Sequence, residues 1–123
     1  MPADSALAQK YVNNACAYLN DGEYDAAISE CGKAIEIDPC FSVAYINRAS
    51  AHSMKGQYDL VIKDCSKAIQ LEPDLPLAYL NRGMAYRSLG RKTEALSDFE
   101  RFVTLTKSSQ LIEIARKQMG DLS

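Results

Sequence analysis

SVAYINRASAHSMKGQYDLVIKDCSKAIQLEPDL, residues 42–75, contains two helical patterns separated by a glycine. In the first half, residues at i, i+4 and i+7 share one face of a helix, namely Tyr45, Ala49 and His52. Gly56 breaks this pattern. A second apolar stripe follows and ends before Pro73, because proline disfavours helix in the residue that precedes it. The segment therefore predicts a helix-turn-helix unit.

The same pattern occurs three times along the chain. A shift of 34 residues aligns the segment with its neighbours on both sides, and 13 positions are identical between the first two units. Four positions carry one residue type in all three units: Tyr11, Tyr45 and Tyr79; Asn13, Asn47 and Asn81; Ala17, Ala51 and Ala85; Gly22, Gly56 and Gly90. Such a period indicates stacked repeats, because one unit cannot bury its own apolar face.

We expect six helices from these units, over residues 5–20, 24–37, 41–55, 58–71, 75–89 and 92–106. One position carries only small residues, Ala15, Ala49 and Gly83, which predicts a close approach of the two helices in each unit. Cys31 and Cys65 fall on the apolar stripe of the second helices, where we expect them to act as small core residues.

These units resemble tetratricopeptide repeats. The resemblance rests on seven spaced residues and their equivalents 34 residues away: Tyr45, Ala49, Gly56, Tyr58, Val61, Ala68 and Pro73. It implies an all-α fold, a right-handed α-solenoid of about seven helices. We expect a lead-in over residues 1–7, repeat units over 8–41, 42–75 and 76–109, and a capping helix over 110–123.

The last segment, residues 109–122, has one apolar and one polar face. Its apolar residues are expected to pack back on the third unit: Leu111, Ile112, Ala115, Met119 and Leu122. The face that would receive another helix pair is polar or small: Glu113, Arg116, Lys117 and Gly120. We therefore expect a cap that completes a short stack, and the alternative is that this helix docks on a second subunit.

The resemblance implies that the first helix of each unit lines a concave groove, which binds a peptide or protein segment. The side chains expected there are Gln9, Val12, Asn13, Cys16, Val43, Ile46, Asn47, Ser50, Leu77, Leu80, Asn81, Met84 and Arg87. This mostly neutral lining favours a ligand with apolar anchors. The recurring asparagines either bond a peptide backbone or tie each helix to the neighbouring repeat.

Some members of the family bind the acidic C-termini of chaperones through a clamp of lysine, asparagine and arginine side chains. The places that carry this clamp correspond here to Val12, Cys16, Asn47, Leu77 and Asn81, and only Asn47 matches. Without the cations, a ligand's carboxylates would lose their charge-assisted hydrogen bonds. Co-chaperone-type binding of acidic tails is therefore disfavoured.

Composition argues against several other classes of function. A net charge of −2 and a pI near 5.4 disfavour nucleic acid as a partner. We expect no membrane insertion and a cytoplasmic location, because the chain has neither a long apolar run nor a secretory pattern at its start. The four cysteines contain no C-x-x-C pair, and His52 is the single histidine, so we expect no metal and no cofactor. Catalytic motifs are missing as well, which predicts that the chain is not an enzyme.

Charged side chains are expected on the surface. The acids of the second helices are predicted to be solvated: Asp25, Glu30, Asp59 and Asp64. Arg48 and Arg82 are predicted to cover apolar surface with their stems and to keep the charge outside. With Arg87, Arg91 and Lys92 they form a basic group near the groove, and binding of an acidic peptide there is a lesser alternative.

Two function hypotheses follow. The first is a monomeric adaptor or scaffold that captures a protein or peptide segment in its groove. The second is an assembly component that forms a weak homodimer through an edge of the stack or through the capping helix.

Overall fold

The computed structural model describes residues 4–120, which form seven helices and no strand. The helices are α1 (Ser5–Asn20), α2 (Tyr24–Ile37), α3 (Ser42–Met54), α4 (Tyr58–Leu71), α5 (Pro76–Ser88), α6 (Lys92–Leu105) and α7 (Ser109–Gly120). The predicted all-α solenoid is confirmed, and the ends of the first six helices lie within one residue of their predicted positions. None of the helices in this part of the chain is long and apolar enough to cross a bilayer.

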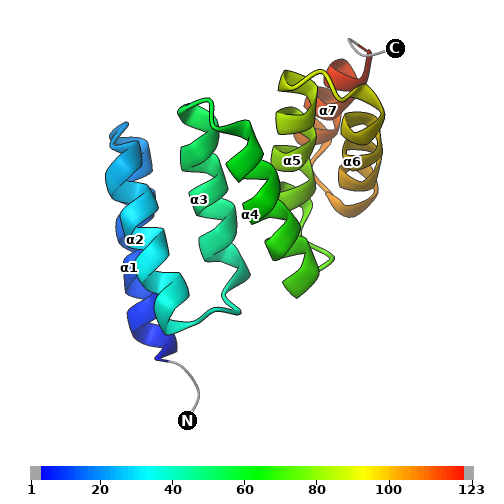
Figure 1. The fold of residues 1–123 in the computed structure, drawn as a ribbon. Coiled ribbons are helices and arrows are strands. Elements are labelled where there is room, and N and C mark those ends of the chain that lie inside the picture. Colours follow the sequence, from blue (N-terminus) through cyan, green and yellow to red (C-terminus); the bar gives the residue numbers. More distant parts are fainter. Residues whose placement is uncertain (1–3, 121–123) are drawn as a thin grey trace.

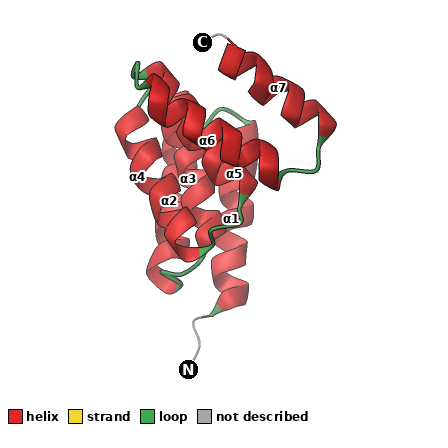
Figure 2. Cartoon of the chain, turned by 90° about the vertical axis from the view of Figure 1, so that its right-hand side faces the viewer, coloured by secondary structure: helices red, strands yellow, loops and turns green. Residues whose placement is uncertain are grey.

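The helices stack in the order of the sequence, so that α1 and α7 lie at opposite ends of the molecule (Figure 1). Figure 2 views the stack from the end that carries α6 and α7. Within the described residues, α3 contacts both α1 and α5 directly, whereas α2, α4 and α6 mainly contact the helices that flank them in sequence. The first helices therefore form the inner, concave layer of the stack.

A glycine at one repeated position closes each helix pair. Gly22, Gly56 and Gly90 have φ angles of 76°, 73° and 77°, a region that glycine enters without a steric penalty. After Gly56, the backbone N–H of Gln57 donates to the carbonyl of His52 at 2.9 Å, while Gly56 itself donates to Ser53 at 3.0 Å. This pair of bonds is a Schellman motif, which ends the first helix and reverses the chain.

Small residues let the paired helices approach closely, as predicted. Ala49 is fully buried beside Cys65 in the second unit. In the third unit the equivalent positions carry Gly83 and Phe99, and a Cβ atom on Gly83 would lie 2.9 Å from Phe99 Cε1. The larger phenyl ring thus occupies the space that the missing side chain leaves.

Two ion pairs join the helices of the second and third units. Arg48 donates two hydrogen bonds of 2.8 Å to the carboxylate of Asp64, and Arg82 does the same to Asp98. Both carboxylates belong to residues that are only 4% exposed. The predictions that Asp64 is solvated and that both guanidinium groups lie outside are therefore wrong. A bidentate pair satisfies both carboxylate oxygens, which makes burial of the two charges tolerable.

The first unit lacks this ion pair. Asn14 stands at the arginine position and is exposed, while Glu30 stands at the acid position and is half-buried. Glu30 approaches Lys33 at 3.7 Å, and its Oε2 atom is buried without a hydrogen-bond partner. The prediction of a solvated acid is thus wrong for Glu30 as well, whereas Asp25 and Asp59 are exposed.

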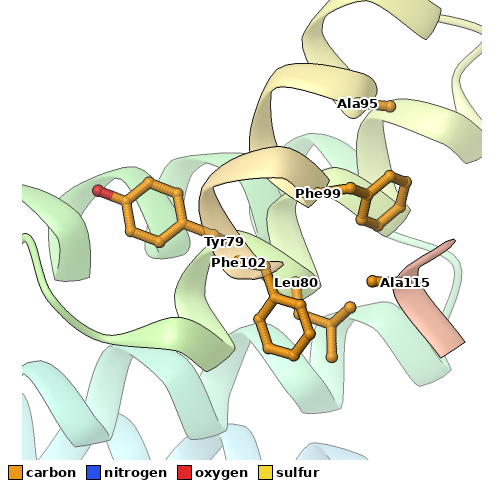
Figure 3. Packing of buried hydrophobic residues seen from close by; sticks show 6 residues of the cluster. All are labelled: Tyr79, Leu80, Ala95, Phe99, Phe102 and Ala115. Atoms are coloured by element: carbon orange, nitrogen blue, oxygen red, sulfur yellow. The ribbon is translucent and has the colours of Figure 1, made fainter. Parts of the chain in front are cut away.

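Helix α7 covers the end of the third unit. Leu80, Phe99, Phe102 and Ala115 belong to one buried cluster, in which both phenylalanine rings and Leu80 lie close to α7 (Figure 3). Leu111 and Met119 pack against this cluster as predicted, Ile112 is half-buried, and Leu122 lies outside the described residues. The opposite face is exposed at Glu113, Arg116, Lys117 and Gly120. Its role as a cap stays a prediction.

The glycine at the helix contact provides a first test. We expect Gly83→Ala to lower the free energy of unfolding by about 1–3 kcal/mol, because the new methyl group overpacks the contact with Phe99. Urea denaturation followed by far-ultraviolet circular dichroism measures this change. Gly32→Ala is the matched control, since nothing lies within 4 Å of its Cβ position in α2 and it should stabilise by roughly 0.5–1 kcal/mol. Equal effects of the two substitutions would contradict the packing explanation.

The cysteines provide a second test. Cys31 and Cys65 are buried, and burial raises the pKa of both thiols to about 12. Cys16 and Cys40 are exposed. The reagent is an aromatic disulfide that releases a coloured thiolate each time it reacts with a cysteine. At about pH 8 we expect it to modify two cysteines in the folded protein and all four in guanidinium chloride. Cys16→Ser should reduce the native count to one, and fast modification of a third thiol in the wild type would show that the core opens.

Candidate peptide-binding groove

The thirteen residues predicted to line the concave groove differ widely in exposure. Seven are exposed: Gln9, Asn13, Cys16, Val43, Leu77, Met84 and Arg87. Three are half-buried: Asn47, Ser50 and Asn81. Three are buried: Val12, Ile46 and Leu80. The inner layer therefore presents fewer aliphatic side chains than predicted, and they belong to Val43, Leu77 and Met84.

The buried residues Val12, Ile46 and Leu80 share one position in the three units, with exposures of 2%, 7% and 8%. Each packs against the first helix of the next unit or, for Leu80, against α7. Val12 clusters with Ala44 of α3, and Ile46 clusters with Ala78 of α5. Although we expected them to line the groove, they fill the contact between one unit and the next and leave little surface for a ligand.

The recurring asparagines join neighbouring units. Asn47 donates to the Sγ atom of Cys16 at 3.5 Å, and Asn81 donates to the Oγ atom of Ser50 at 3.4 Å. Both bonds run from a first helix to the first helix of the preceding unit, which supports the interpretation that asparagine ties adjacent repeats together. Each bond uses one N–H of the amide and leaves its carbonyl oxygen and second N–H to other partners. Asn13 instead accepts a bond from Gln9 at 2.9 Å.

Three of the five residues in the predicted basic group, Arg48, Arg82 and Arg91, pair with acids of the chain. Arg48 and Arg82 turn toward their acids on the second helices, where the hydrogen bonds raise the pKa of both guanidinium groups. Arg91 bonds Glu94 at 2.9 Å and lies 5.0 Å from the ring centre of Tyr86. These cations are neutralised by partners within the chain, which leaves the inner layer with little positive charge from these three residues.

A hollow of about 330 Å³ lies on the inner layer and extends over all three units. It is lined by Leu19, Tyr24, Ser50, Ser53, Met54, Asn81 and Met84. Met54 and Met84 are 63% and 42% exposed. Sequence reasoning included Ser50, Asn81 and Met84 in the groove but missed Leu19, Tyr24, Ser53 and Met54. Met54 could have been found, because the equivalent residues Asn20 and Ser88 are polar.

The chemistry of the groove is that of a binding surface. The exposed thiol of Cys16 accepts a hydrogen bond from Asn47 and lies among neutral residues. His52 is 8% exposed and bonds Gln57 at 2.9 Å, so its imidazole joins α3 to the turn that follows. The groove therefore offers apolar contacts and amide hydrogen bonds.

The stacked helix pairs with a continuous inner layer define a helical-repeat solenoid. The family model described as tetratricopeptide repeat matches residues 8–39, 42–75 and 77–109. The chain belongs to the tetratricopeptide repeat family. A search of curated protein sequences finds no significant match.

Solved structures of this family are similar over nearly the whole chain. The first repeat domain of Spaghetti (RPAP3), bound to the HSP90 peptide SRMEEVD, is 29% identical with a TM-score of 0.92, covering 99% of this chain and 94% of that one. The second repeat domain of human RPAP3, in complex with the HSP70 peptide SGPTIEEVD, is 26% identical with a TM-score of 0.86, covering 95% of each chain. The Arabidopsis OM64 domain is 25% identical with a TM-score of 0.88, covering 94% of this chain and 96% of that one.

Proposed function

We propose that this protein is a non-catalytic adaptor that holds a peptide or protein segment with apolar anchors on its concave face. The observation that carries the proposal is the neutral hollow on the inner layer, bordered by the exposed side chains of Met54 and Met84. Exposed Val43 and Leu77 extend the apolar surface along the first helices. The peptide complexes of two similar domains support a peptide as the ligand.

The ligand we propose differs from the acidic tails that those two domains bind. Of the five places that correspond to the family's clamp, Val12 is buried, Leu77 is 50% exposed and apolar, and Asn81 bonds Ser50. No cation stands at any of these places. A carboxylate placed there would give up hydration without gaining an ion pair.

This difference can be measured with the acidic peptide SRMEEVD. We expect Leu77→Lys/Asn81→Arg to bind it at least roughly 10-fold more tightly than the wild type, because charge-assisted hydrogen bonds contribute about 1.5–3 kcal/mol each. Isothermal titration calorimetry gives both dissociation constants. Asn14→Arg/Leu60→Lys adds the same charge at exposed positions outside the groove and should leave the affinity near that of the wild type. A wild type that already binds as tightly as the clamp variant would restore acidic tails as ligands.

The proposed function itself can be tested with a phage-displayed library of random dodecapeptides. We expect the wild type to enrich peptides whose binding weakens by about 3- to 10-fold with Asn47→Ala or Leu77→Ser, because a hydrogen bond or an apolar contact is lost. Asn14→Ala is the control, since Asn14 is an exposed asparagine of α1 outside the groove. Circular dichroism verifies that all variants keep their helices. Peptides that ignore both groove substitutions would place binding on another surface.

The alternative function, a homodimeric assembly component, is supported by one exposed residue on α7. Ile114 is 47% exposed, whereas Leu111 packs inside against the third unit. Light scattering across a range of protein concentrations distinguishes the two functions. A mass that rises with concentration, and that Ile114→Lys returns to the monomer value, would favour assembly over peptide capture.

A further inference from the structure

We propose that the hollow between Met54 and Met84 receives one large uncharged side chain, aliphatic or aromatic, from an internal stretch of the bound segment. This inference rests on the proposed function and specifies the class of ligand. It assigns the anchor site to the C-terminal halves of α3 and α5, with Met54 about two helical turns beyond Asn47 and Met84 about one turn beyond Asn81.

The repeats themselves indicate that the two methionines are not needed for the fold. The positions equivalent to Met54 carry Asn20 and Ser88, and those equivalent to Met84 carry Cys16 and Ser50. Each unit therefore folds with small or polar residues at these places. The two methionines are exposed at positions where the other units have no methionine, so packing does not explain them. Their flexible thioether side chains are well suited to contact a ligand of irregular shape.

The residues that line the hollow come from all three units. Leu19 and Tyr24 come from the first unit and pack against a buried cluster that joins the first two units. Met54 comes from the second unit and Met84 from the third. The ligand site therefore depends on the stacking of all three units.

The size and charge of the hollow select the anchor. Its volume of about 330 Å³ lies at the lower end of the roughly 300–1,000 Å³ typical of ligand pockets, so it suits a single large side chain. All seven lining residues are uncharged. A carboxylate or an ammonium group would lose hydration there without a counter-charge, whereas an apolar side chain gains free energy by leaving water.

The rim of the hollow favours an internal peptide unit over a chain terminus. The hydroxyl of Ser50 donates to the carbonyl of Ile46 at 3.2 Å and accepts from Asn81 at 3.4 Å, so its single proton is not available to a ligand. Asn81 keeps one N–H donor and its carbonyl acceptor. This pair complements the C=O and N–H of a peptide bond, whereas a terminal carboxylate needs donors alone.

Methionine methyl NMR gives a direct readout of this site. The chain has four methionines, of which Met54 and Met84 line the hollow and Met119, on α7, packs against the buried cluster of the third unit. Peptides enriched from the dodecapeptide library are synthesised with acetylated and amidated ends and titrated into protein labelled with ¹³C at the methionine methyls. We expect the signals of Met54 and Met84 to shift while that of Met119 stays in place.

Substitutions on both sides of the contact complete the test. Alanine in place of the peptide's largest apolar residue should weaken binding by roughly 10-fold or more, and so should Met84→Gln. Leu60→Gln is the matched control, because Leu60 is 40% exposed on α4 and does not line the hollow. The free-acid form of each peptide should bind no more tightly than the amidated form.

The outcomes separate this inference from the proposed function. Peptides that respond to Asn47→Ala, yet leave Met54 and Met84 unshifted or tolerate alanine at every apolar residue, would overturn the anchor site and retain the groove. A free-acid form that binds more than roughly 10-fold tighter would overturn the internal-segment assignment. A library that yields no groove-dependent peptide would contradict both proposals.

Discussion

The distance between the two helices of each unit is set by a small residue on the first helix, and the other contacts depend on that distance. Ala49 faces Cys65 in the second unit, whereas Gly83 faces Phe99 in the third. A smaller residue on one helix thus compensates for a larger one on the other. The helices stay close enough for the arginine–aspartate pairs of both units to form hydrogen bonds of the same 2.8 Å length. The stack can therefore repeat although the core residues change.

Those ion pairs also influence what the protein can bind. In the second and third units the arginine of the first helix is directed to an aspartate on the second helix, so its charge is neutralised within the unit. Of the thirteen residues predicted to line the groove, Arg87 alone is charged. Arg48 and Arg82 are therefore unavailable to pair with a ligand, which is in line with the neutral ligand that we propose.

Comparison of the three units separates residues that serve the fold from residues that are available for function. Asn47 and Asn81 recur with the repeat and bond the preceding unit, so their first role is structural. Met54 and Met84 do not recur, and they are exposed around a hollow to which all three units contribute. The anchor site that we propose therefore rests on residues that depart from the repeat, whereas the contacts between units rest on residues that recur.

The helices, their turns and their order could be predicted from the sequence, because they depend on local signals. Gly56 allows the positive φ that the turn needs, and Pro73 ends the second helix. Only the tertiary structure decided which residues of a first helix face the groove. Val12 and Val43 are both valines of first helices, yet Val12 fills a contact between units and Val43 is exposed. That difference depends on how adjacent units are placed against each other, and helical periodicity within one unit carries no information about this placement.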